Sequence, residues 1–139
     1  MLMTDHELPS EITTGADLRG NEFGWPISSF RDALAKAEAL GYACLGGQFQ
    51  FRLDDCTCEM YWLNADSKER KPEETWTAYC ERTCFEVKLS FERIARETDF
   101  VKEAMEWAPV RQAAVDGVDP MQWLVFVAYF VDETVWSKL

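Results

Sequence analysis

Hydrophobic positions recur every three or four residues in two stretches of the chain, and this spacing predicts two amphipathic helices. The first begins at Ser28 or Ser29, either of which can cap a helix, and ends at Gly41. Its apolar stripe consists of Phe30, Ala33, Leu34, Ala37 and Leu40. The second helix follows Pro72, and its stripe consists of Trp76, Tyr79, Cys80, Cys84, Val87, Phe91 and Ile94. A strand-like alternation over residues 85–91 competes with it, but the helical period covers a longer stretch, which favours a helix.

The segment between these helices has the pattern of a β-hairpin. Residues 48–53 alternate polar and apolar, which indicates that Tyr42–Leu53 is a strand with one face in water. Gly46-Gly47 interrupts this strand and predicts a bulge or a close backbone approach. Asp54-Asp55 supplies the turn, and Cys58–Leu63 is the returning strand. The adjacent Tyr61-Trp62 pair should then point to opposite faces, with one ring in the core.

The remainder of the chain has weaker patterns. Met1–Gly20 is polar, acidic and aperiodic, which predicts a loose tail, and Gly24-Trp25-Pro26 is typical of a turn. A short helix is expected over Asp99–Trp107 and a loop over Val110–Val118.

Residues 120–131 give conflicting signals. Asp119-Pro120 is a helix-start signal, whereas the run of β-branched and aromatic residues that follows favours a strand. Helix is slightly favoured, and both alternatives stay open. The elements together predict an α+β fold: a small antiparallel sheet, built on a hairpin over about 42–63, packed against three to four helices. Residues 21–139 should form one domain after the tail over 1–20.

The charge of the chain limits the class of its partner. Twenty-five acidic and 14 basic residues give a net charge of −11. Nucleic acid and anionic membranes need a basic surface, so neither is expected as a ligand. A basic protein is the natural complement, because opposite potentials raise encounter rates. The alternative is that the acidity only aids solubility.

The five cysteines argue against a disulfide framework. Their number is odd, and Met1–Ser10 lacks the basic start and apolar core of a signal peptide, so a cytoplasmic location is expected. The longest apolar run, Trp123–Val131, is too short to span a bilayer at about 20 residues per helix. Four of the cysteines could bind zinc, but the Cys56-x-Cys58 spacing is atypical. We therefore expect no metal and no other cofactor.

Catalytic chemistry has little support in the sequence. The single histidine, His6, lies in the expected tail, so a serine or cysteine nucleophile would lack its usual base. The Gly46-Gly47 pair lies within a strand rather than before a helix, so it is not a phosphate loop. Chemistry based on carboxylates and lysines stays open, but no spacing singles out a pair. We expect a protein that is not an enzyme.

The hairpin is the most plausible binding surface in the sequence. One of its two adjacent aromatic residues could be an exposed anchor with acidic residues around it, an arrangement suited to a basic partner. The predicted partner-binding residues are Asp54, Asp55, Glu59, Tyr61, Trp62, Asp66 and Glu69. A solvated, charged hairpin end is the structural alternative.

The order of several short motifs resembles a family of bacterial immunity proteins that accompany polymorphic toxins, in particular the group numbered forty. The pieces, which fall within roughly residues 21–95, are Trp25, the Ala-Leu helix, Gly41, Leu45-Gly46-Gly47, Tyr61-Trp62, Glu74-Thr75-Trp76-x-x-Tyr79 and Arg82-Thr83. Gln48 stands where that group has an acidic residue. The resemblance implies a stoichiometric inhibitor that covers a basic surface of a cognate toxin. A carboxylate- or lysine-based enzyme and a regulatory adaptor are the alternatives.

Overall fold

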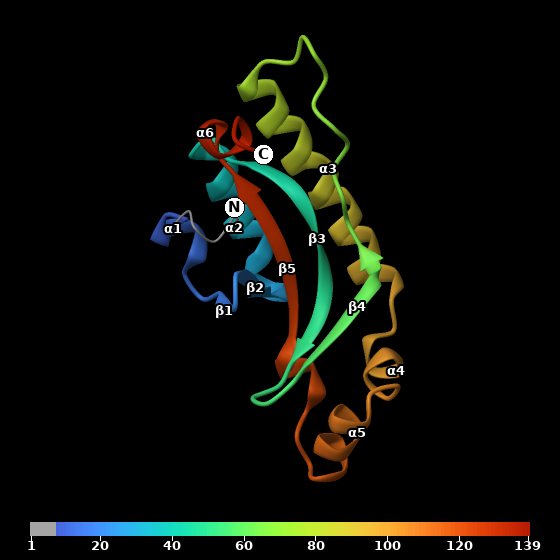
Figure 1. The fold of residues 1–139 in the computed structure, drawn as a ribbon. Helices are drawn as coiled ribbons and strands as arrows, with labels where there is room; N and C mark the ends of the chain where they lie inside the picture. The colour runs from blue at the N-terminus through green and yellow to red at the C-terminus, as the bar shows by residue number, and fades with distance from the viewer. Residues whose placement is uncertain (1–7) are drawn as a thin grey trace.

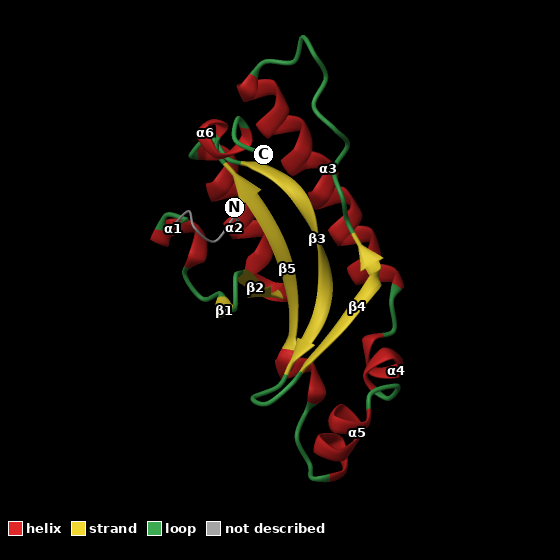
Figure 2. Ribbon diagram, viewed as in Figure 1, coloured by secondary structure: helices red, strands yellow, loops and turns green. Residues whose placement is uncertain are grey.

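Two long helices lie against one face of a five-stranded antiparallel sheet in the computed structural model, which describes residues 8–139 (Figure 1). The helices are α2 (Ile27–Ala39) and α3 (Trp76–Glu97). The strands lie in the order β1 (Asp17–Arg19), β2 (Glu22–Pro26), β5 (Leu124–Val131), β3 (Ala43–Arg52) and β4 (Thr57–Asn64). The shorter helical elements are α1 (Ser10–Thr13), α4 (Phe100–Ala104), α5 (Ala108–Val115), the 3₁₀ turn η2 (Pro120–Trp123) and α6 (Glu133–Trp136). The predicted α+β class is confirmed, and Figure 2 shows its two layers.

The main core is a cluster of phenylalanine rings between the sheet and the two helices. Phe49 and Phe126 come from the central strands, Phe30 from α2 and Phe91 from α3, and each is at most 2% exposed. Ring centroids are 4.5 Å apart for Phe30 and Phe126, and 5.5 Å apart for Phe49 and Phe91. The alternation of β3 and the periodicity of both helices direct these rings inward. None of the described helices has the length and apolar character needed to cross a bilayer.

Of the two alternatives for residues 120–131, the slightly favoured helix is wrong from Leu124 onward. Leu124–Val131 forms β5, which lies between β2 and β3. A central strand is covered on both faces, so its sequence is a continuous apolar run without alternation. The helix-start signal is nevertheless real: the Asp119 carboxylate accepts a hydrogen bond from the Met121 amide at 3.0 Å. That cap stabilises only the single turn of η2, and β5 begins directly after it.

The expected loose tail over residues 1–20 needs correction from Leu8 onward, whereas residues 1–7, including His6, lie outside the described residues. Helix α1 buries Ile12, whose carbonyl accepts a hydrogen bond from Trp25 Nε1 at 2.8 Å. Trp25 itself belongs to β2 rather than to a turn, and it is fully buried. The predicted loop over residues 110–118 is also wrong, because α5 occupies most of it.

The face of β3 expected to lie in water is instead largely buried. Gln50 is 0% exposed and Arg52 is 5% exposed. The Arg52 guanidinium donates to the Asp17 carbonyl at 2.6 Å and to the Glu22 carbonyl at 3.1 Å. Arg19 in β1 also donates to the Cys56 carbonyl at the β3–β4 turn. The sheet therefore coils until β1 approaches the opposite hairpin, which shields the polar side chains of this face.

The predicted bulge at the glycine pair is confirmed. The register between β3 and β5 shifts between Cys44 and Gly46, and Gly46 has φ +136°. A Cβ atom on Gly47 would lie 2.0 Å from the Val127 carbonyl oxygen, so only glycine fits there. The segment after β4 crosses this bulge, where the Ala65 amide donates to the Gly47 carbonyl at 2.9 Å. The glycines allow this close approach between chain segments and hold the end of β4 in place.

Candidate protein-binding surface

A bulge of three residues in β4 exposes Tyr61 and Trp62, the two aromatic residues predicted for the binding surface. Gln48 pairs with Asn64 while Phe49 pairs with Met60, so residues 61–63 have no partner in β3. The Asn64 side-chain amide donates to the Tyr61 carbonyl at 2.9 Å and closes the bulge. Tyr61 is 70% exposed and Trp62 is 47% exposed, and their rings meet edge to face at 5.1 Å.

The prediction that one of the two rings would lie in the core is therefore wrong. It assumed regular alternation along β4, and the bulge interrupts that alternation at this point. The prediction that an exposed aromatic residue lies at the hairpin holds for both.

Trp62 is supported by residues from the region after α3. Its ring stacks on Trp107 with centroids 6.3 Å apart, and its Nε1 donates to the Glu103 carboxylate at 3.1 Å. The Nε1 atom of Trp107 is buried and has no acceptor among the described residues. We name Tyr61, Trp62 and Trp107 the edge aromatic cluster. Trp107 and Glu103 are far from Trp62 in sequence, and no spacing in the chain links them.

The predicted acidic residues all lie exposed along β4 and its two ends. Asp54 and Asp55 form the turn before the strand, and Asp66 and Glu69 follow it. Glu59 lies within β4, where its carboxylate accepts hydrogen bonds from the Gln48 and Gln50 side-chain amides at 3.3 and 3.4 Å. The structure thus arranges these residues along one sheet edge rather than in a compact patch.

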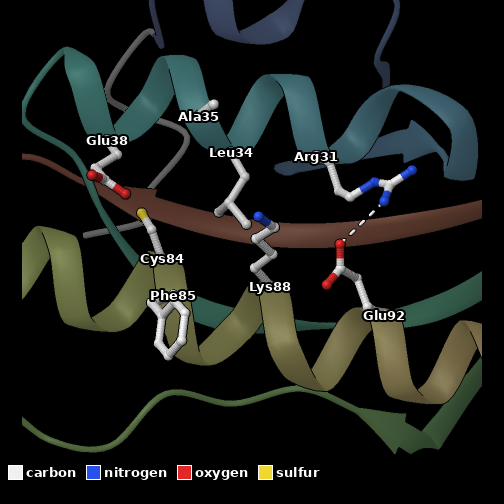
Figure 3. Close-up of a pocket in the computed structure, with 8 residues that line it drawn as sticks. All are labelled: Arg31, Leu34, Ala35, Glu38, Cys84, Phe85, Lys88 and Glu92. Carbon is white, nitrogen blue, oxygen red and sulfur yellow. Dashed lines mark hydrogen bonds and ion pairs between the residues drawn. The ribbon is translucent and has the colours of Figure 1, made fainter.

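A groove between α2 and α3 is the competing site (Figure 3). It has a volume of about 300 Å³, and an ion pair of 3.1 Å between Arg31 and Glu92 lies at one end. Cys84 lies at the opposite end, where burial raises the pKa of its thiol to about 12. A thiol with so high a pKa is hardly ionised near neutral pH and is a poor nucleophile. The groove therefore offers mixed charge and apolar contact but no activated group.

The five cysteines are all free thiols. Burial raises the pKa of Cys58 and that of Cys80 to about 11, as expected for thiols that pack like small apolar side chains. Within residues 8–139, no three histidine, cysteine or acidic side chains converge in a way that could hold a metal ion.

Most of the motifs behind the immunity-protein resemblance have structural roles. Glu74 forms a two-pronged ion pair with Arg82, with oxygen–nitrogen distances of 2.7 and 2.9 Å. Thr75 caps α3 by accepting a hydrogen bond from the Ala78 amide at 3.1 Å. These contacts fix the start of α3 and the loop before it.

The other residues of that motif attach α3 to the sheet and to the end of α2. Trp76 Nε1 donates to the Gly41 carbonyl at 2.8 Å, just after α2 ends. The Thr83 hydroxyl accepts a hydrogen bond from the Cys44 amide at 3.1 Å and is fully buried. Among the pieces of the resemblance, Tyr61-Trp62 supplies the most exposed aromatic side chains.

Comparisons with protein-family models, with curated proteins and with solved structures give no match for this chain. The resemblance to immunity proteins stays a prediction.

Proposed function

We propose that this protein is an immunity-type inhibitor that binds a basic toxin domain stoichiometrically and covers its functional surface. The observation that carries the proposal is the exposed Tyr61–Trp62 pair, held out by a bulge at an acidic sheet edge. Aromatic residues dominate the binding energy of many interfaces, especially when less critical contacts surround them and exclude water. We propose that the two rings are the central contacts and that the acidic residues spread along the same edge are peripheral ones.

The charge of the chain supports a basic protein partner. A net charge of −11 attracts a basic domain over a distance and repels nucleic acid and anionic membranes. The proposed setting is the cytoplasm of the bacterium that makes the toxin. Asp54 and Asp55 are exposed at the hairpin tip, where they would mainly accelerate encounter rather than strengthen the final complex.

Two strongly bonded ionisable groups outside this surface also fit binding better than catalysis. The Glu74 carboxylate is paired with Arg82, and this contact lowers the pKa of Glu74 to about 2. A carboxylate with so low a pKa is a weak general base. Tyr129, which donates to the Glu22 carboxylate, has its pKa raised by burial and by that contact. These two groups serve internal contacts and are poorly placed to exchange protons with a substrate.

The test is co-expression with the toxin domain encoded beside the gene, followed by binding measurements across salt concentrations. We expect growth rescue, and association that slows as salt rises because exposed charges are screened within about 10 Å at 0.1 M. Neutralising Asp54, Asp55 and Glu59 together should lower the on-rate more than it raises the off-rate.

A matched control variant separates the effect of the acidic residues at the hairpin from the effect of the net charge on the association rate. The variant E11Q/E38Q/E81Q removes three exposed acids from α1, α2 and α3 and changes the net charge equally. It should slow association less than the hairpin variant does. If the protein neither rescues growth nor binds the toxin domain, the proposed function is wrong.

A further inference from the structure

The two edges of the sheet differ in how open they are to another strand. β1 has only three residues, two of them charged, and its Arg19 is bonded to Asp17, to the Cys56 carbonyl and to Thr57. β4 has eight residues and contains no lysine, arginine or proline, the residues that commonly protect an edge. No other strand of residues 8–139 lies beyond β4 (Figure 2). This edge is therefore the one able to accept a further strand.

The hairpin register shows which backbone groups face outward. The Leu53 amide donates to the Cys56 carbonyl at 2.9 Å, and these two residues are adjacent to the Arg52–Thr57 pair. Hydrogen-bonded and non-bonded pairs alternate along an antiparallel ladder. Because Leu53–Cys56 is a hydrogen-bonded pair, Arg52–Thr57 and Gln50–Glu59 are non-bonded pairs. The backbone groups of Cys58 and Met60 therefore bond to β3. The amides and carbonyls of Thr57 and Glu59 point away from β3. Among the described residues, no loop or helix bonds to those outward groups.

We propose that the partner adds a short β-strand to the free edge of β4 and bonds to the outward backbone groups of Thr57 and Glu59. This inference rests on the proposed function and specifies its binding mode. The regularly paired part of β4 is Thr57–Met60, and the bulge follows it directly. The added strand would therefore be about four residues long, or roughly 13 Å at 3.3 Å per residue. Tyr61 and Trp62 would lie at its end and contact side chains of the partner.

Charge identifies the chemistry of the added strand. Glu59 is exposed within the paired segment, and its carboxylate is held by the Gln48 and Gln50 amides. A lysine or arginine opposite Glu59 would form a favourable cross-strand pair, whereas a like charge would oppose pairing. A second copy of this chain would bring another net charge of −11 to the same edge. The occupant is therefore a basic strand of the toxin domain rather than a second copy.

The decisive variant is Glu59→Pro, compared with Glu59→Gln. Both remove the carboxylate, but only proline removes the outward amide, and proline is tolerated in edge strands where the N–H faces solvent. Loss of one interfacial backbone hydrogen bond should make E59P about tenfold weaker than E59Q in binding the toxin domain. Equal affinities for folded E59P and E59Q would overturn the inference.

Hydrogen–deuterium exchange of the unaltered protein provides a second test that does not depend on the folding of E59P. The amides of Thr57 and Glu59 should exchange quickly in the free protein and become protected when the toxin domain binds. Cys58 and Met60 should be protected in both states. Binding without new protection at Thr57 and Glu59 would disprove the added strand and leave the proposed function intact. Absence of any binding would instead disprove the proposed function, and protection by self-association alone would show that a second copy occupies the edge.

Discussion

Two clusters of aromatic residues at opposite ends of α3 use the same residue types for different purposes. The first joins Trp76, Tyr79 and Trp136, with ring centroids 5.3–6.4 Å apart. Tyr79 is 2% exposed, and Trp76 donates its N–H to the Gly41 carbonyl. The guanidinium carbon of Arg70 lies 5.2 Å from the centre of the Trp76 ring. This cluster attaches the C-terminal α6 and the loop before α3 to the body of the fold.

The edge aromatic cluster is more exposed and less completely hydrogen-bonded than the first cluster. Tyr61 is 70% exposed, and Trp107 has a buried Nε1 with no acceptor in the described part of the chain. Trp62 is anchored by a single hydrogen bond to Glu103. Aromatic rings that are held in place yet remain accessible lose little freedom on binding, which favours affinity. The comparison indicates that the first cluster stabilises the fold and that the second is available to a partner.

The largest expected effect is on stability, in the first cluster. Trp76→Ala should lower the free energy of unfolding by about 3 kcal/mol, the lower end of the range for tryptophan truncation because the ring is only partly buried. Trp76→Phe should lose about 1 kcal/mol, chiefly the hydrogen bond to Gly41. Chemical denaturation measures both. A loss below about 1 kcal/mol for Trp76→Ala would show that this cluster does not stabilise the fold.

The next effect is on binding, in the edge aromatic cluster. Tyr61→Ala should weaken binding of the toxin domain by about 2 kcal/mol, or roughly 30-fold, as expected for a central anchor. Its free energy of unfolding should change by less than about 0.5 kcal/mol, because the side chain is mostly exposed. Surface binding and denaturation measurements on one preparation give both values. A large stability loss without a binding loss would assign Tyr61 to the fold instead.

A pH-dependent effect is expected from the ion pair beside the first cluster. Hydrogen bonding to Arg82 lowers the pKa of Glu74 from 4.5 to about 2. The folded-state pKa is the lower one, so the stabilisation is complete above about pH 4.5 and is lost as the pH falls towards 2. Glu74→Gln should therefore flatten the decline in unfolding free energy across this window. Glu73→Gln is the neighbouring control, and an equal flattening by it would contradict a specific role for Glu74.

The smallest effect is expected at Trp107. Trp107→Phe should change the free energy of unfolding by less than about 1 kcal/mol, because losing ring area is offset by removing an unpaired buried N–H. The contrast with Trp76→Phe distinguishes a ring whose N–H is bonded from one whose N–H is not. A loss above about 2 kcal/mol would show that the Trp107 N–H is satisfied in solution.

The sequence predicted the elements whose apolar residues recur with a regular period. α2, α3 and the β3–β4 hairpin each have an apolar face that repeats with the period of the element, so their pattern is readable. β5 was misassigned because a strand buried on both faces shows no alternation. β1 and α1 were missed because contacts distant in sequence hold them, such as the bond between Trp25 and the Ile12 carbonyl.

The candidate site was predicted in part for a similar reason. Tyr61 and Trp62 stood out as adjacent aromatic residues among acids, and both are exposed. The bulge that exposes both depends on how β4 pairs with β3, which local sequence does not encode. Trp107 and Glu103 join the surface only through tertiary packing of the region after α3.

A calorimetric titration with the proposed partner, a basic toxin domain encoded next to the gene, tests the central claim most directly. It would compare the unaltered protein with Trp62→Ala and with Phe85→Ala, which removes an exposed ring from α3 in the competing groove. We expect one-to-one binding, a loss of affinity of roughly 30-fold for Trp62→Ala and no change for Phe85→Ala. No binding by the unaltered protein, or a loss confined to Phe85→Ala, would contradict the proposal that the β4 edge binds a basic partner.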